Sequence, residues 1–210
     1  MEASFKDRLK KGETLLGTII SIPSPEIAEL LSKSGFDWLF IDMEHSAITL
    51  KDAQRMIQAA CEHAHCILRV PGNEEIWIKR SLDTGAEGLI IPQVNSKEEA
   101  KKAVTHSKYP PQGNRSIGIS RAHDFGVHFT SYLERANEEI ALIIQCEHTD
   151  AVKNLPEILQ VGGIDCIFTG PYDLSASMGK TGKLHDPEVA RAITYIQQQC
   201  RQKNMPQGIF

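Results

Sequence analysis

Short apolar runs alternate with amphipathic stretches along most of the chain. The apolar runs cover residues 14–22, 37–42, 66–70, 88–94, 141–147 and 166–173, and a seventh run begins at 206. The run at 141–147 begins with apolar and β-branched residues, as in a strand that is buried on both faces. Six alternations of strand and helix predict a parallel sheet with helical crossovers.

The helix starts are marked by residues that can cap them. Thr49–Asp52 and Ser96–Glu99 have the sequence of capping boxes. Asn73 is expected to cap a helix that ends near Thr84. Short connections between these helices and the strands agree with a compact α/β arrangement.

Regular periodicity is lost between residues 108 and 137, where we predict an irregular connection. Connections of that length are usually functional or are ordered by a partner. Arg115 and Arg121 lie in it, and they are candidates for binding a distal carboxylate of a substrate. A solvated loop or an interface ion pair explains them equally well.

Polar residues follow several different strands at their carboxyl ends, namely His45, Arg69, Gln93, Glu147 and Asp173. This distribution is typical of the active face of a (β/α)₈ TIM barrel, whereas an open sheet would gather its ligands at one switch point. We therefore predict one barrel domain over residues 1–210. The chain stops in the seventh strand, so the eighth strand of a barrel is expected to be missing from it.

Composition narrows the function classes. The net charge of -4 gives no electrostatic footprint for nucleic acid, and no apolar run is long enough for a membrane span. The start of the chain is charged and lacks an apolar signal core. Five cysteines without C-x-x-C spacing favour reduced thiols in the cytoplasm over a zinc–thiolate site.

Candidate metal ligands lie at the ends of two of the apolar runs. Gln145 and Glu147 share one face of their strand because side chains alternate along it. A carboxylate at the end of a buried strand is costly unless a cation meets it. We therefore predict that Glu147 and Asp173 are two ligands of one divalent metal. A structural ion pair is the alternative for Glu147, and a helix cap is the alternative for Asp173.

Several segments together resemble a known family. They are FDWLFIDMEHS, LRVP, IKRSLDTGAEGLIIPQV, YPPQGNRSIG, IIQCE and FTGPYDLSASMG. They resemble the HpcH/HpaI aldolase/citrate lyase family, and most of all its metal-dependent class II pyruvate aldolases. The resemblance covers essentially the whole chain. It implies retro-aldol cleavage of a 2-keto-3-deoxy or 4-hydroxy-2-oxo acid to pyruvate and an aldehyde, through a metal-stabilised enolate.

The resemblance also implies roles for individual residues. The metal would be Mg²⁺, Mn²⁺ or Co²⁺, held by Glu147 and Asp173, and an oxygen-rich ligand set suits all three ions. His45 matches the catalytic base and Arg69 the substrate-binding arginine. The resemblance further implies a homo-oligomer, with a hexamer plausible, and an eighth strand and a helix that this chain lacks.

The chemistry of the residues agrees with these roles. Imidazole titrates near neutral pH, so His45 suits proton abstraction from a substrate hydroxyl. A histidine base needs an orienting carboxylate, for which Asp42, Glu44 and Asp83 are candidates. The spacing does not choose among them, and Asp42 and Asp83 match the family better.

The substrate itself is predicted to contact the turn after the sixth run. Backbone N–H groups around Tyr172 and Asp173, in the turn that begins at Gly170, are candidates for holding the substrate carboxylate. Gln145 is a further candidate, through a water or as an ordinary buried amide.

Three other functions remain open from the sequence. Oxaloacetate decarboxylation passes through the same enolate of pyruvate. A citrate-lyase-like CoA thioester lyase ranks lower, because the chain shows no CoA-phosphate patch. The non-enzyme alternative is an incomplete barrel that serves as a structural subunit.

Overall fold

Seven parallel strands form one sheet in the part of the chain that the computed structural model describes, residues 3–210. They lie side by side in the order in which they occur along the chain. The strands are β1 (Gly17–Ile20), β2 (Trp38–Asp42), β3 (His65–Arg69), β4 (Gly88–Ile91), β5 (Ala141–Cys146), β6 (Cys166–Thr169) and β7 (Gln207–Ile209).

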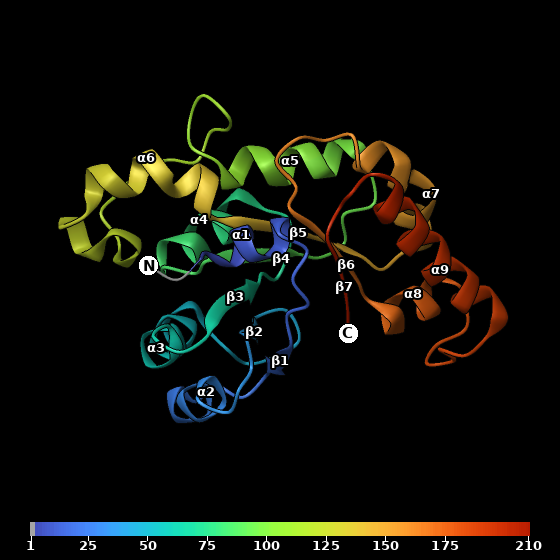
Figure 1. Cartoon of the computed structure of the whole chain (residues 1–210), viewed down its shortest axis with the longest axis horizontal. Coiled ribbons are helices and arrows are strands. Elements are labelled where there is room, and N and C mark those ends of the chain that lie inside the picture. The colour runs from blue at the N-terminus through green and yellow to red at the C-terminus, as the bar shows by residue number, and fades with distance from the viewer. Residues whose placement is uncertain (1–2) are drawn as a thin grey trace.

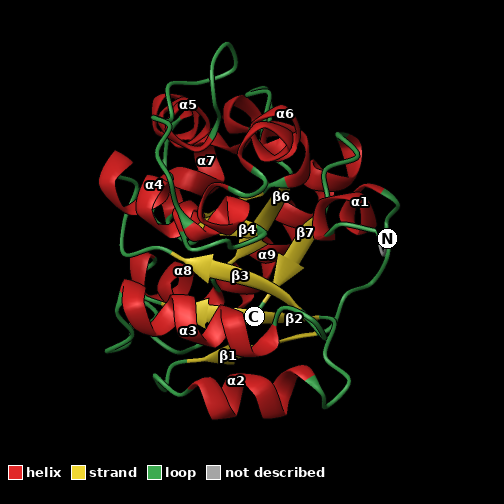
Figure 2. Ribbon diagram, turned by 90° about the vertical axis from the view of Figure 1, so that its left-hand side faces the viewer, coloured by secondary structure: helices red, strands yellow, loops and turns green. Residues whose placement is uncertain are grey.

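Helices surround the curved sheet and connect successive strands (Figure 1, Figure 2). They are α1 (Phe5–Lys10), α2 (Pro25–Ser32), α3 (Leu50–Ala60), α4 (Glu75–Asp83), α5 (Lys97–Ser107), α6 (Phe129–Glu139), α7 (Thr149–Ile158), α8 (Pro171–Ser177) and α9 (Pro187–Gln202), with a short 3₁₀ turn, η1 (Arg121–Gly126). The predicted alternation and the parallel sheet are confirmed.

Each strand has an outer and an inner face. On β2, Leu39 and Ile41 pack outward against the helices, whereas Trp38 and Phe40 belong to a separate inner cluster. The inner cluster takes alternate residues from the other strands as well, including Ile67 and Phe168. Because the side-chain period of a strand is two, any polar residue that continues this alternation points into the interior of the sheet.

Helix α1 covers the end of the sheet where the strands begin. Phe5 lies 5.6 Å from Trp38, ring centroid to centroid, and Lys6 Nζ lies 3.0 Å from Asp165 Oδ1, just before β6. Apolar packing and a buried ion pair thus cover this end of the sheet. Polar side chains lie at the opposite end, where the strands finish.

The segment from 108 to 137 differs from its prediction. Residues 129–139 form α6, which packs Tyr132, Leu133 and Ala136 against the core. Asp124 and Phe125 before the helix have positive φ angles. The apolar residues at 129, 132, 133 and 136 have helical spacing, so the predicted irregular connection is wrong for this part of the segment.

Two predicted caps also differ. Asn73 does not cap α4: its Nδ2 donates to the Glu99 carbonyl at 2.9 Å, and Glu74 takes the cap position without a side-chain bond. Ser96 does cap α5, but Glu99 accepts from the Asn95 N–H rather than closing the box. The Thr49–Asp52 capping box is confirmed.

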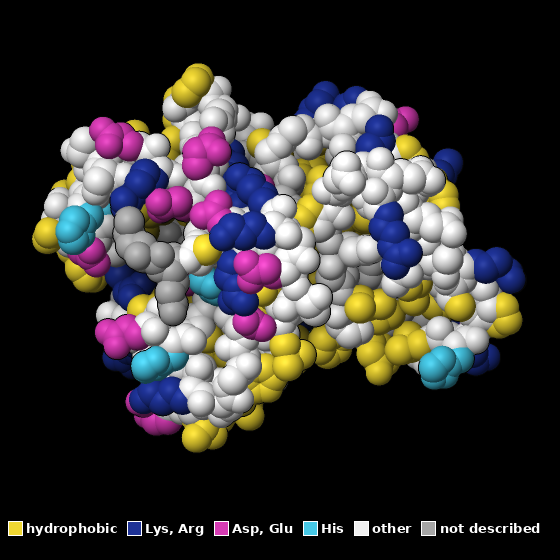
Figure 3. Space-filling view, viewed as in Figure 1, with side chains coloured by type: hydrophobic (Ala, Val, Ile, Leu, Met, Phe, Trp, Pro, Cys, Tyr) yellow, Lys and Arg dark blue, Asp and Glu magenta, His cyan; other side chains and the backbone are white. Residues whose placement is uncertain are grey.

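The seven-stranded sheet corresponds to a half-barrel and agrees with a TIM-barrel-like fold. A full (β/α)₈ barrel, and the expected absence of its eighth strand from this chain, stay predictions. Among residues 3–210, no helix is both long and apolar enough to cross a bilayer. Figure 3 shows acidic and basic side chains intermixed over the left half of the face in view and mainly basic ones over its right half.

Candidate active site

An ion pair joins the ends of β2 and β3. Asp42 and Arg69 follow Phe40 and Ile67 by two positions, so both side chains point inward, and the register places them opposite each other. Arg69 Nε donates to Asp42 Oδ1 at 2.8 Å and Nη2 donates to Oδ2 at 2.7 Å. Burial alone would raise the pKa of Asp42, but the guanidinium holds it below its usual range.

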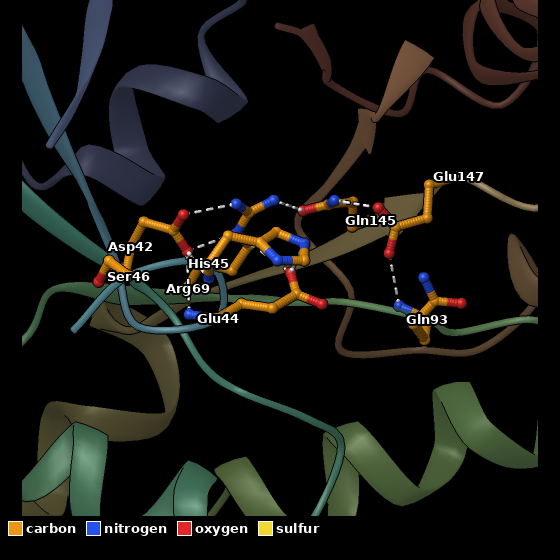
Figure 4. Close-up of polar contacts among 8 residues, drawn as sticks. All are labelled: Asp42, Glu44, His45, Ser46, Arg69, Gln93, Gln145 and Glu147. Carbon is orange, nitrogen blue, oxygen red and sulfur yellow. Dashed lines mark hydrogen bonds and ion pairs between the residues drawn. The ribbon is translucent and has the colours of Figure 1, made fainter. Parts of the chain in front are cut away.

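Further hydrogen bonds extend this pair across the mouth of the sheet (Figure 4). Arg69 Nη1 lies 3.4 Å from Gln145 Oε1, and Gln145 Nε2 donates to Glu147 Oε2. The backbone N–H of Gln93 donates to Glu147 Oε1 at 2.9 Å. We call Asp42, Arg69, Gln145, Glu147 and Gln93 the strand-end network. The prediction that Gln145 and Glu147 share a face is confirmed.

Glu147 is buried to 2 % exposure, directly after β5. Burial raises the pKa of its carboxyl group, and the nearby Asp173 carboxylate raises the pKa further. The Gln93 N–H and the Gln145 amide oppose this shift. A Cβ on Gly170 would lie 3.0 Å from Glu147 Oε2, so the glycine lets the chain approach the carboxylate closely.

The loop after β2 brings two more titratable groups. Asp42 Oδ1 accepts from the Glu44 N–H at 3.0 Å, which fixes the turn, and Ser46 Oγ donates to the Asp42 carbonyl. His45 Nε2 lies 3.7 Å from Glu44 Oε2, which is itself 3.2 Å from Arg69 Nε. Glu44 Oε2 has no hydrogen-bond donor among the described residues. Burial raises the pKa of Glu44 to about 7.

A cavity of about 160 Å³ opens beside these groups. His45, Arg69, Gln145 and Asp173 contribute its polar lining, and its other lining residues are Ile19, Phe40, Phe168, Gly170, Pro171, Tyr172 and Phe210. Larger hollows of about 810 and 870 Å³ lie elsewhere and share none of these four polar residues. The small cavity is therefore the candidate active site on chemical grounds.

The structure does not bring Asp83 to His45. Helix α4 starts near the carboxyl end of β3 and leads back to the start of β4, so Asp83, its last residue, lies at the opposite end of the sheet. There, Asp83 Oδ1 accepts from Arg115 Nη2 at 2.8 Å. Among residues 3–210, Asp42 accepts from the His45 N–H and Glu44 lies 3.7 Å from the His45 imidazole.

The two arginines of the 108–137 segment lie away from the cavity as well. Arg115 is fully buried, and its guanidinium stacks 4.5 Å from the ring centroid of Tyr109. Arg121 Nη1 donates to the carbonyl oxygen of Thr84, just after α4. The candidate role of both residues in binding a distal substrate carboxylate therefore finds no place within this chain.

Two residues of the site were given no particular role by the sequence. Glu44 was only one of three candidate carboxylates, and the backbone of Gln93 was not considered. Pro92 was the available signal, because proline ends the strand ladder and leaves the next N–H for another acceptor.

The carboxylate oxygens of the site can be compared with the ligands that a hard cation such as Mg²⁺ requires. No group of three His, Cys, Asp or Glu side chains in residues 3–210 forms a closed metal cluster. Glu147 and Asp173 are nevertheless close enough for the Asp173 carboxylate to raise the pKa of Glu147, and Asp173 lines the cavity. Two carboxylates fit an open site of the Mg²⁺ type, which keeps several positions for water and substrate.

Polar groups at the carboxyl ends of several strands of a TIM-barrel-like sheet are typical of enzymes of this fold class. The family model of the HpcH/HpaI aldolase/citrate lyases matches residues 18–207, and the chain belongs to this family. The resemblance noted in the sequence is thereby confirmed. The chain is accordingly a lyase of the aldehyde-lyase type, and the class II aldolases of its family depend on a divalent metal.

Similar proteins cover the whole chain. A 4-hydroxy-2-oxo-heptane-1,7-dioate aldolase of Shigella flexneri is 39% identical, over 100% of this chain and 79% of that protein. The protein of that name from Klebsiella pneumoniae is 40% identical, over 100% and 80%. The crystal structure of a family member from Burkholderia cenocepacia J2315 superimposes with a TM-score of 0.94 at 34% identity, covering 98% of this chain and 83% of that one.

Proposed function

We propose that the chain is a divalent-metal-dependent aldolase that cleaves a 4-hydroxy-2-oxo acid to pyruvate and an aldehyde. The observation that carries the proposal is the strand-end network. In it the Gln145 amide lies between the guanidinium of Arg69 and the buried carboxylate of Glu147. His45 lines the same cavity. The names of the relatives support this substrate class.

Glu147 and Asp173 would hold the cation, which we propose to be Mg²⁺, Mn²⁺ or Co²⁺. When bound, the ion would supply positive charge next to the keto oxygen of the substrate. The Gln145 amide fixes the Glu147 carboxylate from one side, and the Gln93 N–H fixes it from the other. The backbone N–H groups around Tyr172 and Asp173, in the turn that begins at Gly170, would bind the substrate carboxylate.

Arg69 is held ready for negative charge. Two of its nitrogens are engaged by Asp42, while Nη1 keeps only a long contact of 3.4 Å to Gln145. A substrate oxygen that gains negative charge can therefore attract Nη1 without breaking the pair with Asp42. This geometry favours the enolate over the ketone, which is the requirement for catalysis.

His45 would take the proton of the C4 hydroxyl. As that proton leaves, the C3–C4 bond breaks, the aldehyde forms and the electron pair moves into the enolate of pyruvate. A proton returned to C3 then gives pyruvate. Asp42 fixes the turn that carries His45, since its carboxylate accepts from the His45 N–H at 3.3 Å. Glu44 is the carboxylate nearest the imidazole, at 3.7 Å.

We also propose that residues 1–210 form one barrel domain and that the protein is a cytoplasmic homo-oligomer. All five cysteines are free, which agrees with a reducing compartment. Ile117, Ile119, Phe125 and Val127 are exposed apolar residues in and beside η1, which agrees with contacts to further copies.

The test is pyruvate release from a panel of 4-hydroxy-2-oxo acids, with and without EDTA. Glu147→Ala should abolish release, whereas Glu157→Ala, an exposed glutamate on α7, should not. Carbon dioxide from oxaloacetate with no aldol cleavage would favour the decarboxylase alternative. Folded, metal-loaded protein that releases pyruvate from no substrate would contradict the proposal.

A further inference from the structure

Gln93 has an unusual backbone conformation at the site. Its φ angle is 54°, in the left-handed region, which non-glycine residues adopt at an energetic cost. The other non-glycine residues with positive φ among residues 3–210 are Asp124, Phe125 and Asn204, which lie in turns away from the cavity. Such strain persists only where the surrounding structure maintains it.

The local sequence explains how the chain turns at this point. Strand β4 ends at Ile91, and Pro92 has no N–H to give to the ladder. Gln93 then leaves the strand direction, and its N–H points to Glu147 Oε1 at 2.9 Å instead of to a neighbouring strand (Figure 4). The left-handed turn thus carries one specific hydrogen bond.

The side chain of Gln93 does not account for its conformation. The residue is exposed, and within residues 3–210 its side-chain amide makes no hydrogen bond to the protein. Gln93 therefore contributes its backbone N–H to the site, and its φ angle sets the direction of that N–H.

We propose that Gln93 is a positioning residue, whose left-handed backbone holds the Glu147 carboxylate in the orientation that binds the divalent cation. Gln93 fixes Oε1 and the Gln145 amide fixes Oε2, so the carboxylate cannot rotate about its terminal torsion. Its remaining lone pairs are then presented together with Asp173. This inference rests on the proposed metal site and adds a determinant outside its ligands.

The test compares residues that differ in their tolerance of a positive φ. Gln93→Gly and Gln93→Asn both keep the N–H and adopt the left-handed region readily. Gln93→Val keeps the N–H, but its β-branched side chain disfavours that region, and Gln93→Ala is intermediate. Each chelator-stripped variant is titrated with Mn²⁺ by calorimetry, and its thermal midpoint is measured in parallel.

We expect the glycine and asparagine variants to bind Mn²⁺ within twofold of the wild type. Gln93→Val should bind at least about tenfold more weakly, as expected for the loss of one hydrogen bond to a charged group. If the valine variant does not fold, the ratio of the alanine to the glycine Kd decides in its place. Wild-type affinity in the glycine variant, which has no side chain, separates the effect of the backbone conformation from that of the glutamine amide.

Two results would overturn the inference. Equal Mn²⁺ affinity for all folded variants would mean that the turn does not orient Glu147. Equal weakening by glycine, asparagine and valine would mean that the glutamine side chain acts instead. If the wild type itself does not bind Mn²⁺, the proposed metal site fails, and the positioning role fails with it.

Discussion

Arg69 meets Asp42 through two parallel hydrogen bonds, Nε to Oδ1 at 2.8 Å and Nη2 to Oδ2 at 2.7 Å, on strands whose register sets the two residues opposite each other. Both residues are buried, at 8 % and 1 % exposure. A buried ion of either sign is costly alone, so each residue stabilises the other.

Replacing one partner of this ion pair should destabilise the protein more than expected from the effect of replacing both. Arg69→Met leaves the Asp42 carboxylate buried and unpaired, so the free energy of unfolding should fall by about 3–5 kcal/mol. The double variant Asp42→Asn/Arg69→Met should lose less than the sum of the two single variants. Urea denaturation of all four proteins measures this coupling, and strictly additive losses would contradict it. All three variants should lose catalysis.

Metal removal should abolish turnover reversibly. EDTA should stop pyruvate release, and Mg²⁺, Mn²⁺ or Co²⁺ should restore it. Glu147→Gln and Asp173→Asn should each lower kcat/KM by about a hundredfold or more, because both remove a charge that would hold the ion. Asp150→Asn, at an exposed carboxylate on α7, is the matched control. Turnover that resists EDTA after dialysis would rule out this role for the pair.

Glu44 should make the stability of the metal-free protein depend on pH. Its pKa is raised from 4.5 to about 7, chiefly by burial, so the folded state binds the extra proton between these values. Stability attributable to this group therefore falls as pH rises through that window. Glu44→Gln should be more stable than the wild type by about 2–3 kcal/mol at pH 8 and nearly equal at pH 5.

The measurement for Glu44 is urea denaturation at both pH values in the presence of a chelator. Glu62→Gln, which alters an exposed carboxylate, should follow the wild type at pH 5 and at pH 8. A Glu44→Gln variant that is destabilised at pH 8 would show that the carboxylate is better paired than its surroundings indicate.

Arg115 should matter for stability rather than for substrate binding. Its buried guanidinium stacks on Tyr109 and bonds Asp83, so Arg115→Ala should lower the free energy of unfolding by about 3–5 kcal/mol. Arg121→Ala, which removes one hydrogen bond to the Thr84 carbonyl, should cost about 1 kcal/mol. KM measured well below the unfolding temperature should be unchanged in both variants. A raised KM for Arg115→Ala alone would point to a contact with substrate.

Periodicity in the sequence was enough to predict the strands and the shared face of Gln145 and Glu147, because a strand alternates its side chains strictly. It could not pair Asp42 with Arg69, since that contact depends on the register between two strands. Within residues 3–210 Asp83 lies far from His45, because α4 runs back along the sheet to its opposite end, and the role of Asp83 in orienting His45 stays a prediction. Helix α6 was not predicted, although the apolar residues at 129, 132, 133 and 136 have the spacing of one helix face.

The order of the strands predicts which parts of the sheet unfold locally most often. β1 and β7 are each bonded on one side only in the described sheet, whereas the strands between them are bonded on both. Amide protons near the outer edges should therefore exchange with solvent first, and those of β3, β4 and β5 last. The strand-end network spans β2 to β5, so its residues lie on or next to strands that are bonded on both sides, whereas His45 and Asp173 lie outside the network. Local opening of the outer strands can thus occur while the network keeps its hydrogen bonds.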